Sequence, residues 1–311
     1  TTVNAAEIAH FSRLSSLWWD EQGEFALLHR MNPVRAQFVR DKMVECMRDE
    51  DTASSWEHAE RRDVLRGMDV LDVGCGGGLF SESLARLGAR TLGIDASESN
   101  IRIASLHASA DPQLRGPPSS SNAPSSPSGS LEYRHVTADV LLGEGKAKQY
   151  DVVCSMEVVE HVDNPAAFLA SCAELVKPGG HLFLSTIART PLAYLLTILA
   201  AEHILRKVSV GTHTYSKFIN PAELIEFFAG YRSPVSSPLA APSSSASASL
   251  PPNRPWITRT YADGLPTRTE AEVRGLMYLP WSGEWTLAPR SWTAWGAAGC
   301  NYLFWVRKPV E

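Results

Sequence analysis

The stretch VLDVGCGGGLF, residues 70–80, decides the fold. An apolar run ending at Val73 predicts a strand, and the apolar spacing that follows the glycines predicts a helix. Gly74, Gly76 and Gly78 allow backbone conformations that other residues avoid, and they let a ligand approach the backbone closely. Strand, glycine-rich turn and helix in this order predict a nucleotide-type binding loop.

Strand and helix patterns alternate on either side of this loop. Strands are expected at 68–73, 90–95, 131–139, 150–156, 181–187, 272–280 and 301–308, and helices at 78–88, 97–109, 164–180 and 220–231. Strands that alternate with helices predict an α/β fold with a mainly parallel, doubly wound sheet. Ligands of such sheets bind beyond the carboxyl ends of the strands.

The chain divides into a helical cap over 1–66 and a larger α/β domain over 67–311. Two Ser/Pro-rich stretches, 116–130 and 233–255, cannot bury enough apolar surface to offset the entropy of ordering them, so both are expected to be flexible insertions. The apolar segment within 189–217 predicts either a buried lid helix or an interfacial helix that faces a membrane or a prenyl tail.

Charge and cysteine usage exclude several classes. The net charge of −5 gives no general attraction to nucleic acid. Five scattered cysteines without metal-type spacing predict reduced thiols rather than a zinc site or a disulfide framework. No apolar run reaches the roughly 18 residues of a membrane span.

Two aspartates indicate the cofactor. Asp95 closes the next expected strand, 21 residues after Gly74, where a carboxylate can accept from both hydroxyls of a ribose. Asp72 immediately precedes the loop. A carboxylate there would repel a polyphosphate but can accept a hydrogen bond from an ammonium group. The pattern resembles motif I of class I S-adenosylmethionine-dependent methyltransferases. This resemblance implies a Rossmann-like, mostly parallel seven-stranded sheet with helices on both faces and an antiparallel last strand.

The same resemblance implies two further cofactor contacts. Asp139 takes the position of the acid that meets the adenine amino group, and Met156 the position of a side chain that packs against the cofactor. The residues themselves leave open a capping aspartate and a core methionine.

Longer segments narrow the family. The segments 10–35 (HFSRLSSLWWDEQGEFALLHRMNPVR), 71–89, 150–165 (YDVVCSMEVVEHVDNP), 175–180 and 211–224 (GTHTYSKFINPAEL) are similar to the ubiquinone-biosynthesis O-methyltransferase family. The resemblance implies methyl transfer to a catechol hydroxyl of polyprenylated precursors, namely a dihydroxy-polyprenylbenzoate and demethyl-ubiquinol. It also implies that S-adenosylmethionine is bound by Arg35, Asp72, Gly74, Gly76, Asp95, Asp139 and Met156. The Arg35 guanidinium suits the methionyl carboxylate, because the two can pair bidentately.

The acidic run EVVEH follows the strand expected at 150–156. On a helix, Glu157, Glu160 and His161 would share one face. Locally the pattern fits a cation site, proton transfer or a wet helix surface. The resemblance implies that these three hold a divalent cation, foremost Mg²⁺, with Zn²⁺ or Mn²⁺ as alternatives. Such a cation lowers the pKa of a catechol hydroxyl.

Catalytic roles are expected for Glu160, His161 and His213, with Lys217 as a further pocket group. The resemblance also implies a membrane surface and other ubiquinone-biosynthesis proteins as partners. The insertions suggest a eukaryotic member that is peripheral on the matrix side of the mitochondrial inner membrane. Two alternatives stay open: a metal-independent small-phenol methyltransferase, and a non-catalytic scaffold subunit of a biosynthetic complex.

Overall fold

The computed structural model describes residues 2–50, 57, 61–114, 129–204, 209, 211–212, 214–234 and 254–310. The insertions expected at 116–130 and 233–255 therefore lie almost entirely outside the described residues. His213 also lies outside them.

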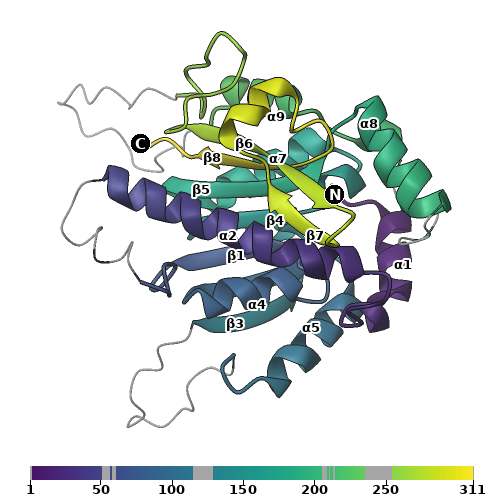
Figure 1. Ribbon diagram of the computed structural model, residues 1–311. Coiled ribbons are helices and arrows are strands. Elements are labelled where there is room, and N and C mark those ends of the chain that lie inside the picture. The colour runs from purple at the N-terminus through teal and green to yellow at the C-terminus, as the bar shows by residue number, and fades with distance from the viewer. Residues whose placement is uncertain are drawn as a thin grey trace, which may run out of the picture.

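Eight strands of the described chain form one sheet, in the order β3-β2-β1-β4-β5-β8-β6-β7 (Figure 1). They are β1 Asp69–Val73, β2 Arg90–Asp95, β3 Ser130–His135, β4 Tyr150–Met156, β5 Val176–Ile187, β6 Ala271–Leu279, β7 Glu284–Leu287 and β8 Asn301–Arg307. Strands β1 to β5 pair in parallel, whereas β8 runs antiparallel to both β5 and β6. The expected parallel sheet with an antiparallel last strand is confirmed, with one more strand than predicted, because β7 adds a hairpin to β6.

Side-chain caps mark the start of several helices. They are α1 Ala5–Arg13, α2 Ala26–Asp49, α4 Leu79–Arg86, α5 Glu98–Ala110, α6 Ala138–Gly143, α7 Pro165–Leu175, α8 Pro191–Ala193 and α9 Pro221–Gly230. Helix α5 has Ser97 as its predicted N-cap, which accepts a hydrogen bond from the backbone of Asn100. Helix α9 starts with a capping box between Asn220 and Glu223.

Two predicted boundaries are wrong. The helix expected over 164–180 ends at Leu175, and residues 176–180 already belong to β5, which extends the predicted strand at its start. The strand expected over 131–139 ends at His135, because Thr137 precedes a new helix, α6, that carries Asp139 in its first turn.

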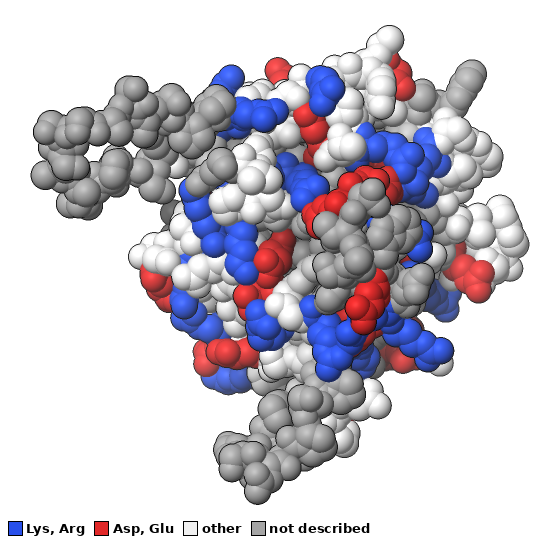
Figure 2. Space-filling model, turned by 90° about the vertical axis from the view of Figure 1, so that its left-hand side faces the viewer, with Lys and Arg blue, Asp and Glu red and all other residues white. Residues whose placement is uncertain are grey.

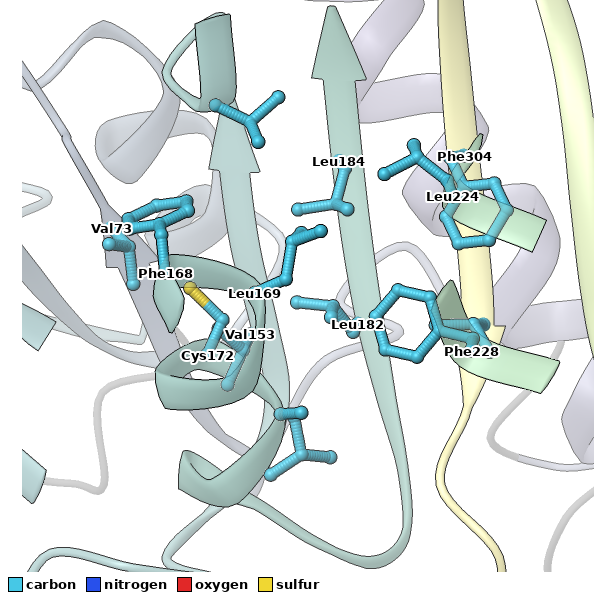
Figure 3. Close-up of a cluster of buried hydrophobic side chains, with 14 of the residues drawn as sticks. Val73, Val153, Phe168, Leu169, Cys172, Leu182, Leu184, Leu224, Phe228 and Phe304 are labelled. Atoms are coloured by element: carbon cyan, nitrogen blue, oxygen red, sulfur yellow. The ribbon is translucent and has the colours of Figure 1, made fainter. Parts of the chain in front are cut away.

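Apolar side chains fill both faces of the sheet. Figure 3 shows the cluster between the sheet and helices α7 and α9, which includes Val153, Phe168, Leu169, Cys172, Leu182, Leu184, Leu224, Phe228 and Phe304. The neighbouring residues on the strands, such as Val152 and Phe183, point to the other face, where α2 contributes Phe38 and Met43. This period of two agrees with strands buried on both sides.

The cap and the lid segment meet beyond the sheet. Helix α1 lies next to the lower end of the α8 segment in Figure 1, and α8 continues as a π-helix over Tyr194–Ile204. The short helix η4 (Tyr215–Lys217) packs against this segment through the rings of Tyr215 and Tyr194, whereas η1 (Ser15–Leu17) contacts α1 and α5. Within the described residues, none of the helices combines the length and the apolar character needed to cross a membrane. On the side of the molecule opposite α1 and α8, basic and acidic side chains are interspersed (Figure 2).

Candidate active site

A cavity of about 870 Å³ lies at the carboxyl ends of the parallel strands. Its wall includes Gly74 and Gly76 after β1, Asp95 at the end of β2, and residues 156–162 after β4. Helix α1 and the β6–β7 hairpin close it from the other side. The cavity is therefore where the strand order predicts a ligand site.

The double-tryptophan segment of the cap covers the glycine loop. Trp18 Nε1 donates to Asn100 Oδ1 over 3.1 Å, and Trp19 Nε1 donates to the carbonyl oxygen of Gly77 over 3.0 Å. A Cβ atom on Gly76 would collide with the Trp18 ring, and Gly76 also has a φ of 54°. The loop thus needs glycine there for two reasons, and the motif that the sequence singled out is part of the same site.

Asp95 is fixed by the loop that it faces. Its Oδ2 accepts from the backbone of Gly76 over 2.9 Å, and its Oδ1 accepts from the backbone of Ser97 over 2.7 Å. Burial raises its pKa, although these hydrogen bonds oppose the rise. Asn100 Nδ2 also donates to Oδ1, over 3.3 Å. Because each carboxylate oxygen has about two acceptor positions, Oδ2 keeps one that can accept from a ribose hydroxyl.

Arg35 and Asp72 lie buried behind the cavity wall. Asp72 accepts from Ser81 Oγ over 2.5 Å, and burial raises its pKa to about 6. Burial lowers the pKa of Arg35, while the charges of Glu157 and Asp72 act in the opposite direction. Among the described residues, Arg35 Nε and Glu157 Oε1 are buried without a hydrogen-bond partner. Unsatisfied buried groups of opposite charge suit a zwitterionic ligand such as the methionyl part of the cofactor.

Met156 and Asp139 differ in position. Met156 is buried in the cavity wall beside Glu157. Asp139 does not form part of that wall; its Oδ1 accepts from Thr137 Oγ1 over 2.5 Å, and Thr137 and Ala138 face the cavity instead. The expected adenine contact of Asp139 stays a prediction. The position of Asp139 in the first turn of α6 favours the alternative interpretation, a carboxylate that interacts with the start of a helix.

The acidic run does not form the helical face that its spacing suggested. Glu157 has a φ of 56°, in the left-handed region, and its backbone N–H donates to the carbonyl oxygen of Ser185 over 3.0 Å. Only Val159–His161 form a turn of 3₁₀-helix. A non-glycine residue in this conformation costs roughly 1 kcal/mol or more, and such strain concentrates at functional sites.

Glu160 is a buried carboxylate, and among the described residues the charge of His161 acts to lower its pKa. Glu160 is 3% exposed and accepts from Thr186 Oγ1 over 2.8 Å. Burial, and then the charge of Glu157, raise its pKa to about 7. The two carboxylates, Glu157 and Glu160, are thus short of neighbouring positive charge.

His161 is held by residues that no local sequence pattern marks. Its Nδ1 lies 3.1 Å from Glu7 Oε2, and Glu7 Oε1 accepts from Lys217 Nζ over 3.0 Å. Burial lowers the pKa of His161, but the hydrogen bond to Glu7 and the charges of Glu160, Glu7 and Glu157 outweigh it and raise the pKa. The i, i+4 spacing of Glu7 and Phe11 places both side chains on one face of α1, and both contact His161. This spacing could have indicated a shared contact, but not that His161 is the partner.

The donor set at this wall suits a cation, although the ligand cluster is not formed. Two carboxylates and an imidazole are donors of the right chemistry, and Glu157 Oε1 is an orphaned acceptor. In the part of the chain that the structure describes, however, no three His, Cys, Asp or Glu side chains are grouped closely enough to hold a metal ion. A cation would require Glu157 to turn toward Glu160.

The strand order, the glycine loop and Asp95 define a class I methyltransferase that depends on S-adenosylmethionine, and residues 54–230 match the family model described as a methyltransferase domain. Over 226 residues the chain is 42% identical to the ubiquinone biosynthesis O-methyltransferase of Roseobacter denitrificans, covering 73% of this chain and 81% of that protein. Over 310 residues it is 38% identical to the mitochondrial ubiquinone biosynthesis O-methyltransferase of Schizosaccharomyces pombe, covering 100% of this chain and 88% of that protein. The chain belongs to the ubiquinone biosynthesis O-methyltransferase family. It is an enzyme that transfers a methyl group from S-adenosylmethionine to oxygen in ubiquinone biosynthesis.

Proposed function

We propose that the enzyme methylates a catechol hydroxyl of polyprenylated ubiquinone precursors, both a dihydroxy-polyprenylbenzoate and demethyl-ubiquinol. The composition of the cavity carries this proposal. Apolar side chains from the cap, the lid and the β6–β7 hairpin line most of it, whereas Glu157, Glu160 and His161 gather after β4. The cap adds Glu7 and Glu24 to the wall, and β2 adds Asp95. Such a cavity suits a polar ring at one end and a long apolar tail at the other.

The cofactor supplies an activated methyl group, so the protein mainly has to position the hydroxyl and manage its proton. Glu157, Glu160 and His161 would hold the divalent cation, Mg²⁺ in the first place, which lowers the pKa of the catechol oxygens. Glu160 and His161 lie in the same cavity wall as Met156 and would serve as proton acceptors. Holding the two reactants in line contributes up to roughly 7–11 kcal/mol of barrier lowering in favourable cases.

Stripped enzyme, a short-chain catechol analogue and several cations test this function. We expect negligible turnover after thorough metal removal, recovery on adding Mg²⁺, and no methylation of the matching monophenol. Activity that is indifferent to metal removal would contradict the cation and favour the metal-independent alternative, which the missing three-ligand group supports. Failure to bind S-adenosylmethionine in calorimetry would favour the scaffold alternative.

A membrane surface is the second part of the proposal. We define the lid patch as Leu192, Tyr194, Leu195, Leu196 and Leu199, whose side chains are 40–51% exposed. Leu192 and Leu196 also line the cavity, as does Trp281, which is 82% exposed. An apolar patch at a cavity mouth is suited to a lipid surface, from which a polyprenyl tail could enter directly. We place the enzyme peripherally on the matrix side of the mitochondrial inner membrane, together with other ubiquinone-biosynthesis proteins.

Flotation with phosphatidylcholine–cardiolipin vesicles tests the lid patch. The variant Leu195→Glu/Leu199→Glu should float several-fold less than the unmodified enzyme, because charge is expelled from the lipid interface. Leu106→Glu is the matched control, since Leu106 is 68% exposed on α5, outside the patch. Equal flotation of both variants would defeat the membrane assignment.

A further inference from the structure

We propose that Glu7 is a positioning residue that holds the His161 imidazole in one tautomer, with its hydrogen on Nδ1 and the lone pair of Nε2 available to the cavity. The inference rests on the proposed function, which gives His161 its role in the site. Either use of the ring, as a proton acceptor or as a cation ligand, needs Nε2 without a hydrogen. Glu7 lies in the N-terminal cap, 154 residues away from His161 along the chain.

The contact itself decides which nitrogen carries the hydrogen. Glu7 Oε2 lies 3.1 Å from His161 Nδ1, and an ionised carboxylate can only accept. Glu7 is also paired with Lys217, whose Nζ lies 3.0 Å from its other oxygen, Oε1. The ammonium keeps the carboxylate charged and fixes its orientation. Nδ1 must therefore donate, which leaves Nε2 of the neutral ring as the acceptor.

Helix α1 restrains the ring in a second way. The Phe11 ring meets the His161 ring edge-on, with centroids 5.1 Å apart and planes at 88°. Glu7 and Phe11 are four residues apart, so they lie on the same face of α1. The carboxylate thus sets the hydrogen position while the phenyl ring limits rotation of the imidazole.

The cap is anchored on both sides of this contact. Ahead of Glu7, Asn4 Nδ2 donates to Asp163 Oδ1 over 2.5 Å, and the carbonyl oxygen of Thr2 accepts from the backbone of Asp163 over 3.1 Å. Beyond Glu7, Ser12 Oγ lies 2.7 Å from Ser97 Oγ in the loop after β2. These contacts tie α1 to the cofactor side and to the loop that carries His161, which makes a fixed Glu7–His161 geometry feasible.

Nitrogen-15 NMR of the labelled histidines tests the tautomer, with His161→Ala identifying the signal. At a pH above the raised pKa of His161, where the ring is neutral, we expect a protonated Nδ1 and an unprotonated Nε2 in the unmodified enzyme. In Glu7→Leu the ring should become a mixture of tautomers, with kcat reduced about 10–100-fold, the usual effect of removing such a partner, and KM nearly unchanged. Glu7→Gln keeps an acceptor oxygen and should recover part of both signals.

Glu21→Leu is the matched control, because it removes an exposed carboxylate from the same cap. It should leave the His161 spectrum and kcat unchanged. If Glu7→Leu keeps the tautomer and kcat while His161→Ala loses activity, the inference fails and the proposed function stands. If His161→Ala is fully active, the role of His161 in the proposed function fails, and the inference fails with it.

Discussion

Two buried charge clusters lie along α2, two helical turns apart, and their carboxylates behave in opposite ways. The site cluster comprises Arg35, Asp72, Glu157 and Glu160. The Lys42 cluster comprises Lys42, Glu45, Glu272, Arg268, Arg274 and Arg290, which join α2 to β6 and to the segment after β7. The site cluster has one cation for three carboxylates, whereas the Lys42 cluster has four cations for two carboxylates, so the two differ in how their charges are paired.

In the Lys42 cluster every carboxylate faces several cations. Burial alone would raise the pKa of Glu272, but the hydrogen bond from Arg290 and the charge of Lys42 outweigh it and lower the pKa to about 2. Arg290 Nε donates to Glu272 Oε1 over 2.7 Å, and Lys42 also lies over the Trp305 ring. Breaking such a pair leaves a buried charge uncompensated, so this cluster stabilises the fold.

In the site cluster, burial outweighs the effects that would lower the pKa values of Asp72 and Glu160. The pKa of Asp72 rises to about 6 and that of Glu160 to about 7, while Arg35 Nε and Glu157 Oε1 lack partners among the described residues. An acid whose pKa is raised by folding destabilises the protein above its unfolded pKa. At this end of α2, Arg35 Nε and Glu157 Oε1 have no hydrogen-bond partner among the described residues, whereas Lys42, two turns further on, is held in ion pairs with Glu45 and Glu272.

The largest expected effect is on stability. Glu272→Gln should lower the free energy of unfolding by about 3 kcal/mol, because the buried Lys42 would lose the nearer of its two carboxylates and keep only Glu45, 3.3 Å away. Denaturant unfolding measures this, and kcat per folded molecule should not change. The double variant Lys42→Met/Glu272→Leu should recover much of the loss. A loss below about 1 kcal/mol for Glu272→Gln would mean that the two clusters do not differ as described.

Glu160→Gln should show the reverse pattern. We expect kcat to fall about 100-fold, equivalent to about 2.7 kcal/mol, because the substitution removes a ligand of the cation or a proton acceptor. The free energy of unfolding should stay equal or rise, because a destabilising buried charge is removed. Steady-state kinetics and denaturant unfolding on the same preparation check both parts, with Glu272→Gln as the reciprocal control. A clear fall in stability without a fall in kcat would reverse the assignment.

The smallest effect concerns pH and Asp72. Burial raises the pKa of Asp72 to about 6 in the free enzyme. We propose that this carboxylate attracts the cofactor's ammonium group, and protonation below that pH removes its charge. The dissociation constant of S-adenosylmethionine should therefore increase by up to about tenfold, or 1.4 kcal/mol, for each pH unit below 6. Calorimetry at several pH values measures it. Asp72→Asn should bind weakly with little pH dependence; an unchanged slope in that variant would assign the titration to another group.

Local patterns predicted the parts of this structure that depend on neighbours in sequence. Strands β2 and β4 occupy the predicted residues, and Ser97 caps α5 as expected, because apolar period and capping chemistry are encoded within a few residues. The positions of the glycine loop and of the site wall after β4 could also be predicted, because each directly follows a predicted strand.

Contacts between distant segments could not be predicted in this way. Lys42 and Glu272 are 230 positions apart, and Glu7 reaches His161 only because α1 folds back over the sheet. The left-handed turn at Glu157 was missed because the spacing of the acidic run also fits a helix, and the hydrogen bond from its backbone to Ser185 on the adjacent strand decides between them. Sequence spacing alone carries no information on such pairing.

The tryptophan cover over the glycine loop has a consequence for substitution. Gly77 needs no unusual backbone angle, yet a Cβ atom there would overlap Trp18. Its restriction is thus set by the position of a residue 59 positions earlier in the chain. The nearest atoms are Cβ and Cγ of Trp18, so a smaller ring at 18 would leave the overlap, and a larger residue at 77 requires the backbone of the cap to move.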